Sequence, residues 1–283
     1  MLETLPPEAV GRSLDDLLAL LRGKRIAVLT GAGCSTESGI PDYRDDDGQW
    51  KRKQPVQFRE FIDDPHARAR YWARSMVGWI PFSRAQPGAT HYSLARLEAS
   101  GRVGVLVTQN VDGLHQRAGS RRGIDLHGNL DSVSCTRCGA AISRAHMQSR
   151  LEDSNPDWYF QHATVAPDGD VDLDGADYGA FDVPSCTVCD GILKPDVVFF
   201  GESVPRRRVE YCYDALAHSD ALLVVGSSLM VFSGYRFIKR AVEQRTPIYI
   251  VNRGKTRGDS ESELKVDGPC AEVMQLLSDR LAV

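Results

Sequence analysis

An apolar run that ends at a glycine-rich turn is the feature that most constrains the fold of this chain. Residues 26–29 are aliphatic, and Gly31-Ala32-Gly33 follows one residue later. A short aliphatic run bounded by glycine predicts a buried strand. Because Gly31 and Gly33 lack a Cβ, their backbone can approach a phosphate closely. Ser35 and Thr36 are predicted to cap a helix whose amides face the anion, so the stretch predicts a dinucleotide-phosphate turn.

The turn differs from that of hydride-transfer enzymes in two ways. Their fingerprint has a third glycine three residues after the second, where this chain has Thr36. It also has an acidic ribose ligand about 20 residues further on, at the end of a second strand. Residues 41–55 predict no strand here, and Asp45, Asp46 and Asp47 lie on a predicted loop. The residues favour nucleotide binding without ordinary dehydrogenase chemistry.

Strands and helices alternate through most of the chain. Apolar runs predict further strands at 103–107, 197–200, 221–225 and 248–251. Helices are predicted at 14–21, 90–101, 205–218 and 271–281, and a capping box of Ser13 and Asp16 is expected to begin the first. This alternation predicts an α/β fold, with a Rossmann-like parallel sheet and helices on both of its faces.

Two segments interrupt the alternation and predict a second, smaller domain. Residues 45–90 show helical spacing and many aromatic side chains, which indicate a helical insertion. Residues 131–192 contain two Cys-X-X-Cys pairs separated by a long acidic loop. We therefore expect a nucleotide-binding domain built from 1–44, 91–130 and 193–283, and a small domain built from the two insertions.

Polar residues follow the predicted strands where the strands end. Beyond the strand at 103–107 lie Gln109, Asn110, Val111 and Asp112. Gly226, Ser227 and Ser228 follow the strand at 221–225, and Asn252, Arg253 and Gly254 follow the strand at 248–251. Ligands of open parallel sheets bind beyond the carboxyl ends of the strands, so these residues predict a ligand pocket. A merely solvated turn is the alternative for residues 108–112.

His127 is the candidate general base. A histidine beside an apolar residue such as Leu126 is more often structural than catalytic. Here it follows the Asn110–Asp112 stretch closely, and Gly128 leaves room for its ring to face a ligand. The ordinary pKa of histidine also suits proton transfer near neutral pH.

Four cysteines form a metal-binding pattern, namely Cys135, Cys138, Cys186 and Cys189. Two Cys-X-X-Cys pairs supply four thiolates, which complete a zinc tetrahedron and leave no open coordination position. We predict one structural Zn²⁺ with no catalytic part. The acidic run at 166–172 resembles a calcium loop superficially, but it lacks the full ligand pattern and the closing glutamate. A structured acidic surface loop is the preferred interpretation.

Composition excludes several classes of partner. The net charge of −4 and a pI near 6.0 give no general attraction to nucleic acid or anionic membranes. No apolar run approaches the roughly 18 residues of a membrane-spanning helix. The first residues show no secretory or transit pattern, and paired cysteines suit a reducing compartment. We expect a cytoplasmic protein that binds neither nucleic acid nor membrane, and we expect a monomer.

The motifs occur in an order that resembles the sirtuin family of NAD-dependent protein-lysine deacylases. They are the glycine turn, residues 39–44, residues 108–112, His127-Gly128, both cysteine pairs, residues 194–202 and residues 226–228. The resemblance extends from about residue 20 to the C-terminus. Residues 71–74 and 78–79, the run at 166–170 and the long gap between the cysteine pairs resemble the class II subgroup, which includes a mitochondrial long-loop sirtuin and bacterial relatives.

The resemblance implies an NAD site made of Gly31, Ala32, Gly33, Ser35, Thr36, Ile40, Asp42, Tyr43, Arg44, Gln109, Asn110, Val111, Asp112, Gly226, Ser227, Ser228, Asn252, Arg253, Gly254 and Cys270. It implies that the acyl oxygen of an acyl-lysine protein attacks the ribose carbon as nicotinamide leaves. His127 then takes a proton from a ribose hydroxyl, Asn110 helps to hold the ribose and a water, and Asp112 belongs to the nicotinamide pocket. The products are nicotinamide and O-acyl-ADP-ribose.

The resemblance also implies where the substrate binds. The substrate backbone is expected to pair as a strand at the edge formed by Val198, Phe199, Phe200, Gly201 and Glu202. Tyr71 and Arg74, three residues apart on a predicted helix, match a pair that reads the carboxylate of acidic acyl groups in a relative. Arginine binds carboxylate through a two-pronged hydrogen bond, so activity on succinyl- or glutaryl-lysine is a further expectation. A half-buried Tyr beside a solvated Arg is the alternative on periodicity alone.

Two alternative functions share the same pocket. Protein ADP-ribosyl transfer uses the same release of nicotinamide and is distinguished from deacylation by its products. A non-catalytic sensor of NAD or ADP-ribose is a third hypothesis, and the presence of Asn110, Asp112 and His127 argues against it.

Overall fold

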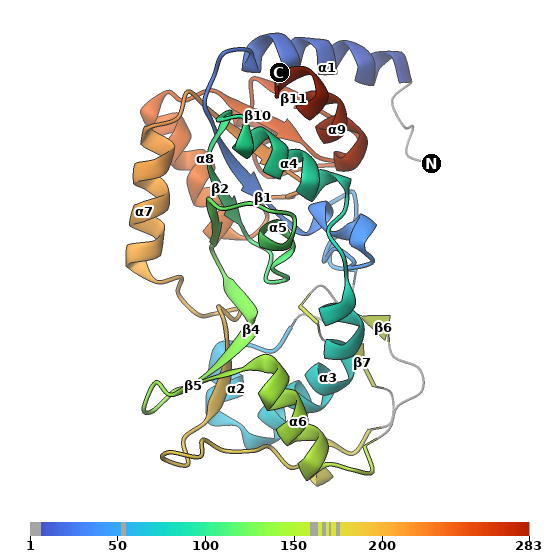
Figure 1. Ribbon diagram of the computed structural model, residues 1–283, viewed down its shortest axis with the longest axis vertical. Coiled ribbons are helices and arrows are strands. Elements are labelled where there is room, and N and C mark those ends of the chain that lie inside the picture. Colours follow the sequence, from blue (N-terminus) through green and yellow to red (C-terminus); the bar gives the residue numbers. More distant parts are fainter. Residues whose placement is uncertain are drawn as a thin grey trace.

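The computed structural model describes residues 7–51, 55–158, 164–165, 168–169, 171–173 and 176–282. It has two parts, one above the other in Figure 1, with a parallel sheet in the upper part and a helical part with a small sheet below. The chain passes between the two parts several times. Within the described ranges, no helix is long and apolar enough to cross a membrane.

The main sheet has six parallel strands in the order β11-β10-β9-β1-β2-β3. They are β1 Ile26–Thr30, β2 Val103–Thr108, β3 Gly123–Asp125, β9 Ala221–Val225, β10 Ile248–Val251 and β11 Leu264–Val266. The predicted strands at 26–29, 103–107, 221–225 and 248–251 are confirmed. Because β1 pairs with β2 on one side and β9 on the other, the strand order reverses at β1, and such a point is where these sheets bind ligands.

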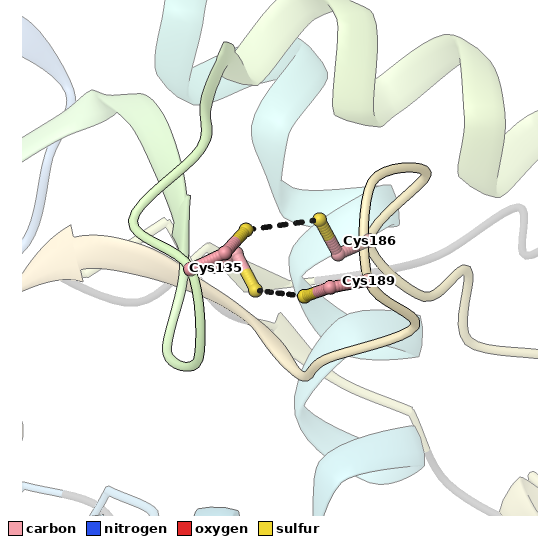
Figure 2. A group of neighbouring side chains, drawn as sticks. Cys135, Cys186 and Cys189 are labelled. Atoms are coloured by element: carbon pink, nitrogen blue, oxygen red, sulfur yellow. Dashed lines mark hydrogen bonds between the residues drawn. The ribbon is translucent and has the colours of Figure 1, made fainter.

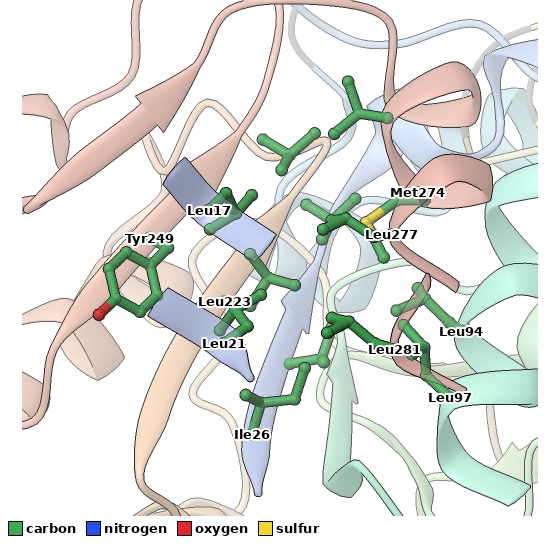
Figure 3. Close-up of a cluster of buried hydrophobic side chains, with 14 of the residues drawn as sticks. Leu17, Leu21, Ile26, Leu94, Leu97, Leu223, Tyr249, Met274, Leu277 and Leu281 are labelled. Atoms are coloured by element: carbon green, nitrogen blue, oxygen red, sulfur yellow. The ribbon is translucent and has the colours of Figure 1, made fainter. Parts of the chain in front are cut away.

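Helices cover both faces of this sheet, as predicted. One face carries α1 Pro7–Leu21, α4 Ala89–Ala99 and α9 Cys270–Leu281, and the other carries α7 Arg206–Ala217 and α8 Phe232–Gln244. Successive side chains of β1 alternate between the two cores, with Val28 in the first and Leu29 in the second. Figure 3 shows how Leu17 of α1, Leu94 of α4 and Leu277 of α9 meet over the sheet.

The second part combines helices with a small antiparallel sheet. Its helices are α2 Phe58–Asp63, α3 Pro65–Arg84 and α6 Arg144–Ser154, and its sheet has the order β5-β4-β8, with β4 Gly128–Cys135, β5 Ala141–Ser143 and β8 Leu193–Val197. A hairpin of β6 Thr164–Val165 and β7 Val171–Asp172 lies beside α3. Trp72 is fully buried in the core of this part and donates its Nε1 hydrogen to the carbonyl of Leu193, at 3.3 Å. This contact joins the helical insertion to the cysteine module.

The predicted strand at 197–200 is wrong in position. The strand is β8, which pairs with β4 in the small sheet, and Leu193, Pro195 and Val197 are its buried residues. Burial of every second residue marks a half-buried strand, whereas the prediction followed the apolar run. Beyond β8 the backbone turns, with Glu202 N donating to Phe199 O at 3.0 Å.

Two helix starts also differ from prediction. Helix α1 begins at Pro7, so Ser13 lies inside the helix and does not cap it. Proline is favourable in the first turn because its missing N–H has no helical partner there. After β1 the chain forms two short 3-10 turns, Ala32–Cys34 and Thr36–Ser38, in place of the predicted α-helix, and the Ser35 side chain caps neither. Gly39 ends the second turn with φ +81°.

Candidate active site

A cavity of about 420 Å³ lies at the carboxyl edge of the main sheet, between the two parts of the molecule. Its walls come from the turn after β1, the ends of β2, β9 and β10, the segment after β8 and the first turn of α8. The reversal of strand order at β1 opens this crevice, because the connections on its two sides leave in opposite directions.

Close backbone contact explains the glycines of the first turn. A Cβ on Gly31 would lie 2.8 Å from the carbonyl oxygen of Gly226, and one on Gly33 would lie 2.9 Å from the Cα of Gly226. Gly33 N donates to Gly226 O at 2.9 Å, which ties the turn after β1 to the turn after β9. Gly226 has φ +62°, a conformation that favours glycine. The result is a narrow backbone surface at the edge of the sheet.

Ser35 connects the two polar side chains at the end of β2. Its hydroxyl donates to Asp112 Oδ2 at 2.7 Å and accepts from Asn110 Nδ2 at 3.0 Å. Asp112 Oδ1 accepts from the backbone N–H of Leu114 at 2.9 Å. Burial raises the pKa of Asp112, while the hydrogen bonds from Leu114 and Ser35 oppose that rise. The carboxylate therefore has a fixed orientation beside the cavity.

His127 lies in the same cavity with both ring nitrogens engaged. Nδ1 is 2.9 Å from the carbonyl oxygen of Gln109, and Nε2 is 2.7 Å from the hydroxyl of Ser233. The pKa of His127 is lowered to about 4: burial is the main cause, the Gln109 carbonyl opposes it, and the nearby guanidinium groups of Arg208 and Arg236 contribute to the lowering. The imidazole is therefore neutral at pH 7 and able to accept a proton.

A second pair of buried histidines lies behind the Ser35 cluster. The rings of His91 and His115 are 4.7 Å apart, and His115 Nε2 is 3.0 Å from the Thr30 hydroxyl at the end of β1. His91 Nε2 is 3.5 Å from Ser35 Oγ, and His91 Nδ1 accepts from the backbone N–H of Gly88. Sequence reasoning missed both, because a single histidine within a helical stretch carries no signal of its own.

The buried histidines should make stability depend on pH. Burial, with a smaller contribution from His91, lowers the pKa of His115 from its ordinary value of 6.5 to about 3. Below pH 6.5 the unfolded chain binds the proton that the folded protein excludes, so the free energy of unfolding falls as pH drops. In a His115→Gln variant, the unfolded chain cannot take up this proton. Between pH 6.5 and 5 we expect wild type to lose up to about 2 kcal/mol more than the variant in chemical unfolding. An equal loss of unfolding free energy in wild type and variant over this pH range would contradict this expectation.

Most of the predicted residues line the cavity. Those of the NAD set are Gly31, Ala32, Gly33, Ser35, Ile40, Asp42, Tyr43, Arg44, Gln109, Asn110, Val111, Asp112, Gly226, Ser227, Ser228, Asn252 and Arg253, and those of the substrate set are Tyr71, Val198, Phe199, Phe200, Gly201 and Glu202. His127 lines it too. These side chains come from strand ends and loops far apart in the sequence.

Four predicted residues lie outside the lining. Thr36 is exposed and donates to Gly33 O, and Gly254 packs against the backbone of Asp46. Cys270 is buried with its thiol 3.7 Å from Val251 O. Arg74 donates from Nε to Val171 O at 2.6 Å, which ties α3 to β7. Because these four residues do not line the cavity, their direct contact with NAD or substrate stays a prediction.

Several lining residues have no counterpart in the sequence predictions. They include Asp45, Asp46, Trp50, Asp168, Ser233, Arg236 and Lys255. Trp50 pairs with Arg44 through a cation–π contact at 4.0 Å and packs on Phe200 at 5.6 Å. Residues 45–50 have a mixed polar composition without a strand or helix pattern, so the return of Asp45, Asp46 and Trp50 to the cavity was not predictable.

The four predicted zinc ligands converge at the end of β4. Their sulfur atoms all lie within 4.8 Å of one another, with Cys135 and Cys189 3.5 Å apart and Cys138 and Cys186 3.8 Å apart, as Figure 2 shows. A zinc ion with Zn–S bonds of about 2.3 Å requires sulfur atoms about 3.8 Å apart, so the cluster fits. The backbone N–H groups of Arg137 and Val188 point at Cys135 and Cys186, which stabilises thiolates.

The zinc cluster is separate from the cavity. Strand β4 runs from Gly128, next to His127, to Cys135 seven residues later, so about 23 Å of strand lies between the cavity and the cluster. Four sulfur ligands complete a tetrahedron and leave no position for a substrate. The geometry supports a structural role. The acidic run at 166–172, predicted to form a structured surface loop, lies partly outside the described residues.

The glycine turn, the polar strand ends and the crevice at β1 define an α/β protein of the Rossmann-like nucleotide-binding class. The family model described as Sir2 family matches residues 31–233, and the chain belongs to this family, the sirtuins.

Individual relatives of the chain support the same family. The chain is 57% identical over 266 residues to an NAD-dependent protein deacetylase of Bordetella bronchiseptica, covering 92% of this chain and 97% of the relative. It is 47% identical over 279 residues to NAD-dependent protein deacetylase 1 of Streptomyces coelicolor, covering 99% and 93%. A solved structure described as Sir2 with p53 peptide and NAD⁺ superposes with a TM-score of 0.76 at 30% identity, covering 94% of this chain and 97% of that one.

Proposed function

We propose that this protein is an NAD-dependent protein-lysine deacetylase that releases nicotinamide and O-acyl-ADP-ribose. The observation that carries the proposal is the position of His127, whose neutral imidazole lines the same cavity as the glycine turn and the polar strand ends. The names of the relatives, all NAD-dependent protein deacetylases, support the same reaction. The specific resemblance to class II stays a prediction.

We propose that NAD lies across the strand ends. The narrow backbone surface at Gly31–Gly33 and the turn at Gly226–Ser228 leave room for its phosphates, and Asn252 and Arg253 suit the adenosine side. Gln109 is well placed to orient this region, because its side chain donates to Ser227 Oγ at 2.7 Å. When bound, NAD supplies an electrophilic ribose carbon with nicotinamide as its leaving group.

Asn110 and Asp112 act in this proposal as orienting groups for the nicotinamide end. Both are fixed through Ser35, and Asn110 Nδ2 also donates to Gly31 O at 3.1 Å. A site whose amide and carboxylate are held before the ligand arrives loses little entropy on binding. His127 Nε2 accepts the proton of a ribose hydroxyl, and its neutral state at pH 7 suits that role.

The acyl-lysine is proposed to enter along the segment after β8. Phe199 and Tyr71 pack with ring centroids 5.1 Å apart, and both line the cavity. These aromatic walls suit the apolar lysine stem and a small acyl group. Phe200 O already accepts from Phe58 N at 2.8 Å, and Phe199 exchanges hydrogen bonds with Glu202, so the substrate backbone is expected to pair with the remaining backbone groups of this segment.

Activity on acidic acyl groups stays a prediction that rests on Tyr71 and Arg74. Tyr71 lines the cavity, whereas the Arg74 Nε–H donates to Val171 O. Replacing Arg74 by Met removes the guanidinium and is expected to lower the ratio of succinyl-peptide to acetyl-peptide turnover at least about tenfold, since a charge-assisted pair contributes about 1.5–3 kcal/mol. An unchanged ratio would remove the idea. Lys255→Met, a matched cation loss at the opposite wall, should leave the ratio unaltered.

The test of the proposed function is to incubate the protein with NAD and a panel of acyl-lysine peptides and to weigh every product. Deacetylation gives free peptide, nicotinamide and O-acetyl-ADP-ribose. ADP-ribosyl transfer would instead add the mass of ADP-ribose to protein, and an NAD sensor would leave all masses unchanged.

We also propose acyl-lysine proteins as partners, a monomeric state and a cytoplasmic location. The net charge of −4 supports exclusion of nucleic acid.

A further inference from the structure

The Ser233 hydroxyl lies closer to the His127 ring than its other hydrogen-bonding partner, the Gln109 carbonyl. It lies 2.7 Å from Nε2, on the cavity side, while Nδ1 lies 2.9 Å from Gln109 O. A carbonyl oxygen only accepts, so the geometry assigns the hydrogen to Nδ1. The Nε2 lone pair then faces the cavity, and the Ser233 hydroxyl donates to it. This is the tautomer that a proton acceptor needs.

We infer that Ser233 is a positioning residue for His127, holding the imidazole in the orientation and tautomer from which Nε2 accepts a substrate proton. The inference rests on the proposed function, because His127 is the general base there. A serine hydroxyl has one hydrogen and two lone pairs. It can donate to neutral Nε2 and, after proton uptake, accept from Nε2–H without moving its oxygen.

The fold places Ser233 at this point through its neighbour Gly234. Helix α8 begins at Phe232, and a Cβ on Gly234 would lie 2.3 Å from Gln109 Oε1. The first turn of α8 therefore packs directly on Gln109, whose backbone carbonyl fixes the other side of the His127 ring. Gln109 is itself held by Thr30 O at 3.2 Å and Ser227 Oγ at 2.7 Å. Both partners of the imidazole thus belong to one rigid unit.

The charges around the ring agree with this role. Arg236, one turn after Ser233 on α8, also lines the cavity, and Arg208 of α7 donates to Leu126 O at 3.1 Å. Both disfavour imidazolium and add to the effect of burial, which is the main cause that lowers the pKa of His127 to about 4. A hydroxyl partner adds no charge, so it orients the ring without opposing proton uptake.

The test compares Ser233→Ala with Ser233→Thr, which keeps a hydroxyl, and with Ser149→Ala, a matched change on the exposed face of α6. We expect Ser233→Ala to lower kcat for acetyl-peptide about tenfold, a fraction of the total effect of a general base, with the Kd for NAD and the Tm nearly unchanged. Ser233→Thr should recover kcat to within about twofold, and Ser149→Ala should match wild type. The pH dependence of kcat should shift only in Ser233→Ala.

A second readout needs no NAD. In ¹⁵N NMR of the ligand-free protein, His127 should show a protonated Nδ1 and a hydrogen-bonded Nε2, and the Nε2 resonance should move in Ser233→Ala but not in Ser149→Ala. Wild-type kcat in Ser233→Ala, or an unmoved Nε2 resonance, would overturn the inference. If wild-type protein fails to deacetylate any peptide, the proposed function fails, and the Nε2 resonance still decides whether Ser233 holds the ring.

Discussion

Replacing His127 by Asn is expected to lower deacetylation at least about a hundredfold while NAD binding stays measurable. General bases contribute about 10²–10⁴ in rate, and Asn cannot accept and release a proton near neutral pH. Asn can still donate to Gln109 O, which His127 contacts at 2.9 Å, so the wall of the cavity should persist. His127→Tyr should also abolish turnover. Because Tyr is larger than His, the Asn variant shows whether turnover is lost without added bulk in the cavity.

The measurement for His127 is kcat with acetyl-peptide, beside the Kd for NAD from calorimetry. Exchange of labelled nicotinamide into NAD should survive better than net deacetylation, because nicotinamide leaves before the base acts. The matched control is His146→Asn on the exposed surface of α6, which should behave as wild type. Retained deacetylation in both His127 variants would show that another group is the base.

Cys186→Ala is expected to unfold the small domain or the whole protein. Zinc ligation contributes on the order of 10 kcal/mol to folding in small zinc peptides, which is comparable to the entire stability of a typical domain. The cysteines lie at the end of β4 and in the segment before β8, so losing the metal frees these two strands of the small sheet. Gly191 packs closely against the same cluster, since a Cβ there would lie 2.7 Å from Cys135 Sγ.

The stability test for Cys186→Ala uses thermal unfolding and metal analysis. The variant should bind less than one zinc per chain and should melt far below wild type, and chelation of wild-type protein should give the same result. Cys212→Ala is the matched control, because Cys212 is as buried but belongs to α7 and packs in the main core. It should keep its zinc and lose only about 1 kcal/mol. A Cys186→Ala protein with full zinc and wild-type Tm would contradict the structural role.

The main sheet was predictable because its strands are buried on both faces. Residues 26–29 and 221–225 are unbroken apolar runs, and such runs identify central parallel strands without any knowledge of tertiary contacts. Strand β8 was not predicted in the right place because one of its faces is only partly buried, and Lys194 and Asp196 interrupt its apolar pattern. The edge strands β3 and β11 are only three residues long and carry too little pattern to detect.

The residues of the candidate site also fall into those that the sequence predicts and those that depend on tertiary packing. Gln109, Asn110 and Asp112 were predictable since they follow a recognisable strand, whose end fixes their place in space. Ser233 and Arg236 were not, because their position depends on how α8 packs against Gln109 through Gly234. Ser35 shows the limit of local rules. Its capping role was inferred from spacing, whereas its hydroxyl bonds to Asp112, 77 residues away.

The central claim is that NAD binds along the carboxyl edge of the sheet with its nicotinamide ribose beside His127. The most direct measurement is a crystal structure of the protein soaked with saturating NAD and an acetyl-lysine peptide. The account predicts phosphates at the backbone of Gly31–Gly33 and a ribose hydroxyl within hydrogen-bonding distance of His127 Nε2. A vacant cavity under these conditions, or a ribose bound far from the imidazole, would contradict it.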